Sequence, residues 1–357
     1  MRRDERFELD IHGQRLVFGA GRLADVPREV DALELGRLVL VTTHSAKDHA
    51  DRLAEDLGRR VAARIDEVVQ HVPEAAAAAA VAAVTEAASD GIVTIGGGSA
   101  TGLGKAVAVR TGLPVMAIPT TYAGSEATST YGITGEHKQT GRDPRALPRV
   151  LVYDAALTTR MPPHLTATSG MNALAHCVEA LYGPRANPVT SVAAQEGLRR
   201  LAAALPLAVE TPADLTSRSD ALLGAYLAGW SMEHAGTALH HTLCHVIGGT
   251  YRVNHGEVHA VLLPYVAAYN ASSAPGALGL VAQALGSTDA AHGLRALAER
   301  LGAPTDLASL GLPGDALDDV AERAVAAVGD RNPRRPDGPS LRRLLDDAYA
   351  GRPPGHY

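Results

Sequence analysis

The chain has 357 residues, of which 46% are hydrophobic and 20% charged, and its formal net charge at pH 7 is -6. This length is enough for two domains with a core each, and the composition is typical of a soluble globular protein. A negative chain without a basic tract argues against nucleic acid and membranes as partners. The first residues lack the apolar run of a signal peptide, and two cysteines, Cys177 and Cys244, favour a reducing compartment, so we expect a cytoplasmic protein.

The first half of the chain alternates short β-rich runs with helical patterns. We predict strands at 38–42, 65–69, 92–95, 115–118 and 150–153, and helices at 46–57, 74–88 and 99–110. Strands that alternate with helices of this length predict a parallel sheet built by right-handed crossovers.

The second half is predicted to be helical. After residue 163 no clear strand pattern remains, and the clearest helices lie at 172–182, 189–204, 219–230, 236–247 and 340–350. We therefore expect an α/β domain over residues 1–157 and a helical domain over residues 158–357.

A glycine-rich turn, Gly96-Gly97-Gly98-Ser99, follows a predicted strand and opens a helix. Glycines let the backbone approach a pyrophosphate, and the helix N-terminus offers free N–H groups, with Ser99 as the expected N-cap. The spacing differs from G-x-G-x-x-G, and a tight turn with one glycine at positive φ is the alternative. Three consecutive glycines in this context favour phosphate binding.

Pro119-Thr120-Thr121 follows the next strand at its carboxyl end, where open α/β sheets bind ligands. The two hydroxyls could hold a nicotinamide amide or a ribose. Taken alone, an ordinary Pro-Thr turn is the favoured interpretation.

Histidines cluster in the second half. Asn172 and His176 share one helix face, His241 and His245 share another, and His255 follows. Pairs four residues apart indicate a site, which could bind a metal or an anion. Asn172 is a much weaker metal ligand than an Asp would be.

A polar segment, Lys138–Arg145, is predicted to be a loop whose cations could hold a carboxylate. Taken alone, a solvated loop is the favoured interpretation.

Together with Gly170–His176 and the spacing His241-x3-His245-x9-His255-Gly256, these motifs resemble the iron-containing (group III) alcohol dehydrogenase superfamily over nearly the whole chain. The resemblance implies a Rossmann-like α/β domain with a parallel sheet, an all-α C-terminal domain of the dehydroquinate synthase-like architecture, an active site in the cleft between them, and a homodimer. It implies NADH or NADPH as cofactor, bound by the following residues: Thr43, Gly97, Gly98, Ser99, Thr120, Thr121 and Thr128. Thr43 stands where NAD-preferring relatives often have Asp, so the choice between the two nucleotides stays open.

Within this superfamily the chain is most similar to the maleylacetate reductases, in the segments Tyr122–Glu126, Lys138–Arg145, His240–Val246 and Asn332–Arg334. This similarity implies reduction of the enone double bond of maleylacetate, a dicarboxylate, to 3-oxoadipate in the degradation of aromatic compounds. Metal-dependent members bind their metal with one Asp and three His. Here His176, His241 and His255 match the histidines but Asn172 stands at the Asp position, so we expect no metal requirement.

The resemblance implies that hydride goes to the alkene and that His241 or His245 stabilises the resulting enolate, with Lys138 as a further catalytic residue. The implied substrate-binding residues are Tyr122, Arg142, Asn172, His176, His240 and His255. Three alternatives stay open: a metal-dependent alcohol dehydrogenase that tolerates Asn172, a biosynthetic reductase of another unsaturated keto acid, and a nucleotide-binding protein without turnover.

Overall fold

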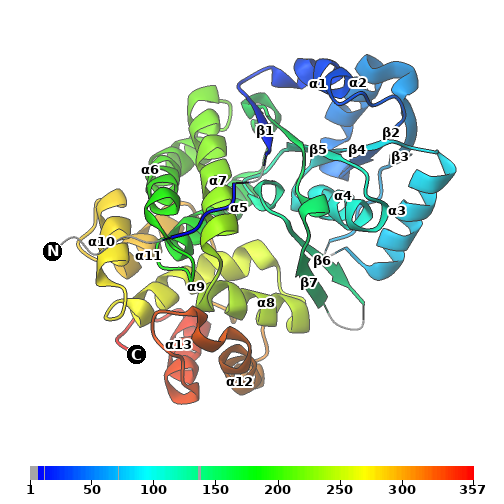
Figure 1. The fold of residues 1–357 in the computed structure, drawn as a ribbon. Helices are drawn as coiled ribbons and strands as arrows, with labels where there is room; N and C mark the ends of the chain where they lie inside the picture. The colour runs from blue at the N-terminus through cyan, green and yellow to red at the C-terminus, as the bar shows by residue number, and fades with distance from the viewer. Residues whose placement is uncertain (1–6, 12, 71, 136–137) are drawn as a thin grey trace.

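The computed structural model describes residues 7–11, 13–70, 72–135 and 138–357, and it places a parallel sheet beside a helical half (Figure 1). The sheet has six strands in the order β1-β8-β5-β4-β2-β3, and every neighbouring pair is parallel. Its strands are β1 (Arg15–Phe18), β2 (Leu38–Thr42), β3 (Val61–Ile65), β4 (Gly91–Gly96), β5 (Val115–Pro119) and β8 (Val150–Tyr153). The predicted α/β fold is confirmed.

Helices cover both faces of this sheet, which explains why its central strands are apolar without alternation. The helices α1 (Val26–Ala32) and α2 (Lys47–Leu57) pack on the face that contains Leu38 and Leu40. The opposite face contains Val39 and is covered by α3 (Glu74–Glu86) and α4 (Gly98–Thr111).

At the two edges of the sheet, one predicted strand was misplaced and one strand was missed. The strand expected at 65–69 is β3 and ends at Ile65, and β1 was not predicted. Each of these strands pairs with a single neighbour, and most of their residues are only partly buried. A short, half-exposed edge strand has a weak hydrophobic pattern, so the sequence gives little signal there.

A small antiparallel hairpin of β6 (Thr130–Thr134) and β7 (Lys138–Arg142) lies between the sheet and the helical half (Figure 1). The expected loop over Lys138–Arg145 is therefore wrong for its first five residues. The β7 sequence is polar throughout and has no apolar face, so hydrophobic periodicity could not predict that it is a strand paired with β6.

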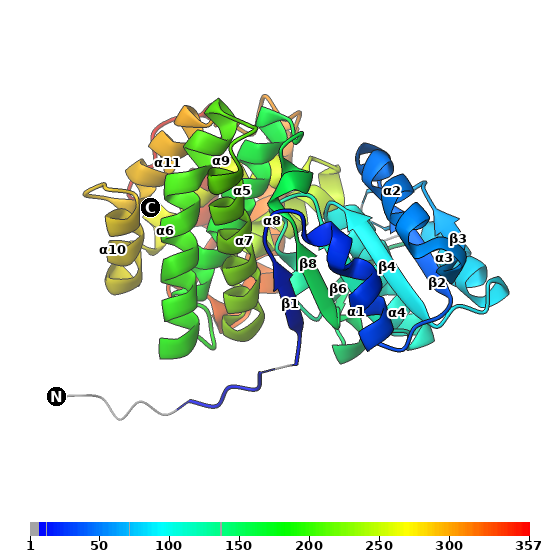
Figure 2. The same ribbon diagram turned by 90° about the horizontal axis from the view of Figure 1, so that it is seen from above.

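The second half is helical, as predicted. Its helices are α5 (Pro163–Ala180), α6 (Pro188–Glu210), α7 (Leu215–Ala235), α8 (Leu239–Tyr251), α9 (His255–Asn270), α10 (Pro275–Ala284), α11 (Ala290–Arg300), α12 (Leu317–Val328) and α13 (Gly338–Ala350). One core lies among α5, α6 and α7, which stand side by side in Figure 2, and another lies among α8, α9, α12 and α13. At the crossing of α6 and α7, a Cβ on Gly197 would lie 3.1 Å from the Gly224 oxygen, so the backbones approach closely.

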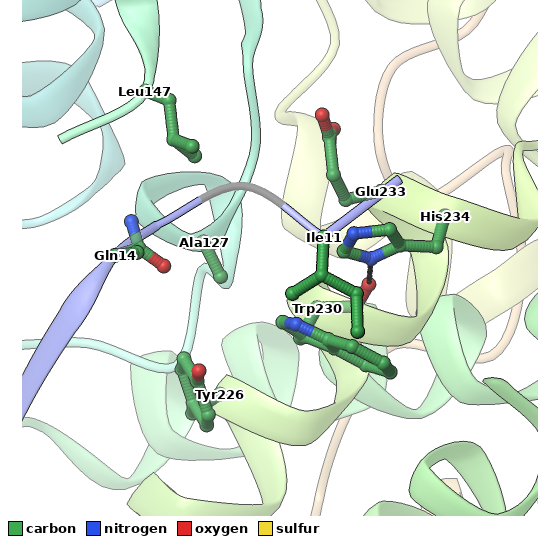
Figure 3. A pocket seen from close by; sticks show the side chains of 8 residues that line it. All are labelled: Ile11, Gln14, Ala127, Leu147, Tyr226, Trp230, Glu233 and His234. Carbon is green, nitrogen blue, oxygen red and sulfur yellow. Dashed lines mark hydrogen bonds between the residues drawn. The ribbon is translucent and has the colours of Figure 1, made fainter. Parts of the chain in front are cut away.

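The chain segment before β1 contacts the helical half. Ile11 and Gln14 line a cavity of about 100 Å³ together with Trp230 and His234 of α7 (Figure 3). The Gln14 side-chain amide also donates hydrogen bonds to two backbone oxygens of the α/β half, at 3.0 and 3.1 Å. This segment therefore touches both halves of the molecule.

Cys177 and Cys244 are both buried and not disulfide-bonded, as expected. Over the described part of the chain, no helix combines the length and the apolar character that a membrane span requires.

Candidate active site

A cleft of about 990 Å³ is lined by residues of both halves. The carboxyl ends of β2 and β4, the hairpin β6–β7, and the helices α5, α8 and α9 all contribute side chains to it. The sequence-predicted residues that line it are Thr43, Gly97, Gly98, Ser99, Thr121, Thr128, Arg142, Asn172, His176, His241, His245 and His255.

The glycine turn forms one wall of this cleft. The strand β4 ends at Gly96, whose φ of +149° suits glycine, and α4 begins at Gly98 with Gly97 as its N-cap. The prediction that Ser99 is the N-cap is wrong, because the helix starts one residue earlier and no side chain caps it. A Cβ on Gly97 or Gly98 would lie 3.2 Å or 3.3 Å from side chains of the cleft wall. Because Gly97 and Gly98 have no Cβ, the first N–H groups of α4 are open to an anion, which fits a dinucleotide pyrophosphate.

Of the predicted threonines, Thr43, Thr121 and Thr128 line the cleft, but Thr120 does not. The Thr120 N–H donates to the Gly96 oxygen at 2.9 Å and joins the ends of β4 and β5. The hydroxyl of Thr128 accepts a hydrogen bond from Lys105 Nζ at 3.1 Å and donates one to the Ser125 oxygen at 2.8 Å.

Lys105, a residue that our sequence interpretation missed, fixes the turn at 125–128. Its Nζ also donates to the backbone oxygens of Ser125 and Thr128 at 2.7 and 2.8 Å. Burial lowers the pKa of Lys105 to about 7, although the negative charges of Glu233 and Glu126 act to raise it. The available signal was a lysine within an otherwise small and apolar helical run, in a chain with only three lysines.

Glu179 on α5 orients His241, the second feature that sequence reasoning missed. Its Oε2 lies 2.7 Å from His241 Nδ1 and accepts from the Ala238 N–H at 2.9 Å, while Oε1 accepts from the His240 N–H at 2.7 Å. Burial raises the pKa of Glu179, but the charge and hydrogen bond of His241 outweigh it, so the pKa is lowered overall. An ionised Glu179 requires the proton on His241 Nδ1, which leaves Nε2 as the reactive nitrogen.

Two imidazole nitrogens on the cleft wall lack a protein partner among the described residues. These are His241 Nε2 and His176 Nδ1, and the two rings stack with centroids 5.0 Å apart. Burial lowers the pKa of His176 well below its usual value, and the neighbouring histidines lower it further, so this ring is neutral at pH 7.

Two predicted substrate-binding residues are enclosed instead. Tyr122 is fully buried and its hydroxyl accepts from Arg218 Nη1 at 3.1 Å. His240 is also fully buried, and its Nε2 lies 2.8 Å from His259 Nδ1. Neither side chain lines the cleft, so the structure does not bring them to the site, and their role as substrate contacts stays a prediction. Sequence similarity could not separate them from their cleft-lining neighbours, because both belong to the same motifs.

Behind the cleft, His240 belongs to a chain of buried polar groups. His259 Nε2 lies 3.1 Å from His255 Nε2 at the cleft surface, and Cys244 Sγ lies 3.7 Å from His240 Nε2. The ligand atoms of His240, Cys244 and His259 are close enough to surround a metal ion, the one such group in the described chain. In the metal-free chain His240 and His259 are hydrogen-bonded to each other, and burial raises the pKa of the Cys244 thiol well above its usual value.

The residues at the position of the family's metal site form a weak donor set. They are three imidazoles and the carboxamide of Asn172, whose nitrogen donates to the Ala123 oxygen at 3.2 Å. A set without a carboxylate fits iron or zinc less well than one that contains Asp. These residues give no support for a catalytic step through a metal.

Arg142 lines the cleft from the hairpin, and its Nη2 lies 2.6 Å from Glu233 Oε1 on α7. The backbone of Lys138 begins β7, but its side chain lies outside what the structure describes, so its predicted role stays a prediction.

Known proteins resemble this chain in architecture and in sequence. Residues 13–155 match the family model "Iron-containing alcohol dehydrogenase", and residues 166–349 match "Fe-containing alcohol dehydrogenase family, C-terminal". The chain is 45% identical to a maleylacetate reductase of Burkholderia cepacia over 97% of this chain and 98% of that protein.

Solved structures agree with these matches. A putative alcohol dehydrogenase of Ralstonia eutropha JMP134 superposes with a TM-score of 0.96 at 44% identity, covering 99% of this chain and 100% of that one. A maleylacetate reductase of Agrobacterium tumefaciens gives 0.93 at 43% identity, covering 98% and 100%. The chain therefore belongs to the iron-containing alcohol dehydrogenase family.

Proposed function

We propose that the protein is a maleylacetate reductase, which uses NADH or NADPH to reduce the enone double bond of maleylacetate to 3-oxoadipate. The main support is the 45% identity to the Burkholderia cepacia maleylacetate reductase over 97% of this chain. The cleft adds imidazole and guanidinium groups that suit a dianionic keto acid. This activity belongs to the degradation of aromatic compounds.

The cofactor would lie along the glycine turn. Gly97, Gly98 and Ser99 would hold the pyrophosphate at the start of α4, and Thr43 and Thr121 would face the ribose and nicotinamide side. When bound, NADH or NADPH supplies a hydride for the alkene carbon β to the ketone.

His241 is the residue best placed to stabilise the charge that develops on the ketone oxygen. As an imidazolium, it would donate from Nε2 to that oxygen, while Glu179 stabilises its positive charge through Nδ1. Protonation of the carbon α to the ketone then restores the carbonyl group, so one hydride and one proton are added in total. His245, on the exposed side of the cleft, is the second candidate donor, and Lys138 and Arg142 are proposed to bind carboxylate.

We further propose that turnover needs no metal, because Asn172 replaces the carboxylate of the metal-dependent members. The test is an assay of maleylacetate with each nucleotide, before and after exhaustive chelation, with metal analysis of the same sample. We expect NADH or NADPH oxidation with 3-oxoadipate as product and unchanged kcat/KM in metal-free protein.

Each contrary result has a distinct meaning. Loss of activity on chelation, with recovery on adding iron or zinc, would show that the site around Asn172 binds a catalytic metal. Faster turnover of simple alcohols with NAD would favour an alcohol dehydrogenase instead. We also propose a cytoplasmic homodimer, which sedimentation and cell fractionation would test.

A further inference from the structure

Two arginine side chains, Arg142 and Arg185, lie together on the cleft wall at the carboxyl end of α7. Arg142 Nη2 donates to the Glu233 backbone oxygen at 2.9 Å. Arg185 Nη2 donates to that same oxygen at 3.2 Å, and its Nε donates to the His234 oxygen at 3.1 Å. The two guanidinium groups share one acceptor and are therefore neighbours.

This pair carries more positive charge than its surroundings neutralise. Within the described chain, the buried carboxylate of Glu233 is the only one in contact with either guanidinium. Burial lowers the pKa of Arg185, and the positive charge of Arg142 lowers it further, which reflects their repulsion. Two cations against one carboxylate leave a net positive charge that a bound anion would offset.

Each guanidinium also has a free edge. Arg142 Nη1 and Arg185 Nη1 make no hydrogen bond to any described residue. A Cβ on Gly236 would lie 3.5 Å from Arg185 Nη1, which places this edge beside the loop that leads from α7 to His241. The backbone carbonyls hold both side chains in place, so little conformational entropy is lost when a ligand binds.

We propose that Arg185 and Arg142 together bind a carboxylate of the substrate, beside the loop that leads from α7 to His241. The planar fork of a guanidinium matches a carboxylate in a bidentate geometry, and maleylacetate has two carboxylates. This role rests on the proposed function. Arg185 belongs to none of the motifs that indicated the site.

The test compares Arg185→Gln and Arg185→Lys with Arg37→Gln. Arg37 is a matched control, because its guanidinium is also held by a backbone carbonyl, the Ala87 oxygen, but does not line the cleft. We expect Arg185→Gln to raise KM for maleylacetate on the order of tenfold to a hundredfold. The affinity for NADH should stay unchanged, and Arg185→Lys should recover part of the loss. Arg37→Gln should match the wild type in KM, and Tm should fall no further in Arg185→Gln than in Arg37→Gln, because both variants lose hydrogen bonds to backbone carbonyls.

Calorimetric titration of 3-oxoadipate into each variant measures the same contact without turnover. Weaker binding in Arg185→Gln alone supports the proposal, whether or not the enzyme reduces maleylacetate. An unchanged KM and unchanged 3-oxoadipate affinity in Arg185→Gln would overturn the proposal and leave the proposed reductase intact. A wild type that does not oxidise NADH or NADPH with maleylacetate would instead overturn the function, and the titration would then decide on Arg185 alone.

Discussion

The missing side chain at Gly98 is what opens the first turn of α4 to the cleft. We predict that Gly98→Val abolishes binding of NADH and NADPH, because the added atoms would stand between the N–H groups and a pyrophosphate. The space toward Ala123 is only 3.3 Å at the position of a Cβ. Equilibrium binding by cofactor fluorescence measures this, with circular dichroism to verify the fold.

The matched control is Gly279→Val on α10, where a Cβ would meet nothing within 4 Å. It should bind cofactor like the wild type. Normal cofactor affinity in a folded Gly98→Val protein would remove the phosphate-binding role from this turn.

Glu179 sets the proton position on His241, so its charge should matter more than its size. We predict that Glu179→Gln lowers kcat on the order of a hundredfold or more, because an amide cannot stabilise an imidazolium as a carboxylate does. Steady-state kinetics with saturating cofactor provides the measurement. If kcat is unchanged while KM rises, Glu179 acts in binding and the proposed role of His241 is wrong.

For individual residues, sequence motifs identified the side chains that line the cleft but not the residues that hold them in position. Gly98 is recognisable because it belongs to a glycine-rich turn that can bind phosphate, and His241 because it belongs to a cluster of histidines. Glu179 and Lys105 are single charged residues in apolar helices, and their partners lie 62 and 23 residues away. The structural contact that gives them a role is therefore invisible in local sequence.

The hairpin β6–β7 connects the two halves through the ion pair of Arg142 with Glu233. We predict that Arg142→Ala raises KM for maleylacetate about tenfold to a hundredfold and also lowers Tm, because the buried Glu233 loses its ion pair. Lys138→Ala should raise KM alone. Parallel kinetics and thermal unfolding of both variants would check this, and unchanged KM in both would return the hairpin to a purely structural role.

Elements with two covered faces or a clear 3.6-residue period were predictable, and the others were not. The central strands β2, β4, β5 and β8 were found because each is an apolar run buried on both sides. The polar hairpin and the two edge strands depend on pairing with distant residues, which local periodicity does not report.

Three buried histidines, His176, His240 and His259, make the stability of the whole molecule sensitive to acid. Burial and the neighbouring histidine charges lower their pKa values, that of His240 to about 3. Below pH 6.5, about the pKa of a histidine in the unfolded chain, the unfolded chain binds protons at these three positions and the folded chain does not. We therefore predict that the unfolding free energy of metal-free protein falls as the pH drops from 7.5 to 5, by up to about 1.4 kcal/mol per pH unit for each group.

Denaturant titrations across this pH range would measure the slope. His259→Asn should flatten it by about one proton's contribution, because one buried imidazole is removed. His356→Ala, at an exposed histidine, should leave the slope unchanged. Equal slopes in the wild type and His259→Asn would contradict the prediction.

The division at residues 157 and 158 stays a prediction, although the last strand of the sheet ends at Tyr153 and α5 begins at Pro163. What periodicity could not show is how the two halves are joined. The segment before β1 and the hairpin both cross between them, and both lack a strong pattern of their own.

The pairing of the first strand with the last strand of the sheet has a consequence for how the chain folds. Arg15 lies opposite Val150, so β1 can join the sheet only after about 135 further residues have been made and β8 is in place. Contacts this distant in sequence cost loop-closure entropy before they stabilise anything, which slows the step that forms them. During synthesis on the ribosome, β1 would therefore stay unpaired while β2, β4 and β5 form their part of the sheet. The segment before β1 could contact α7 only after the helical half had left the ribosome.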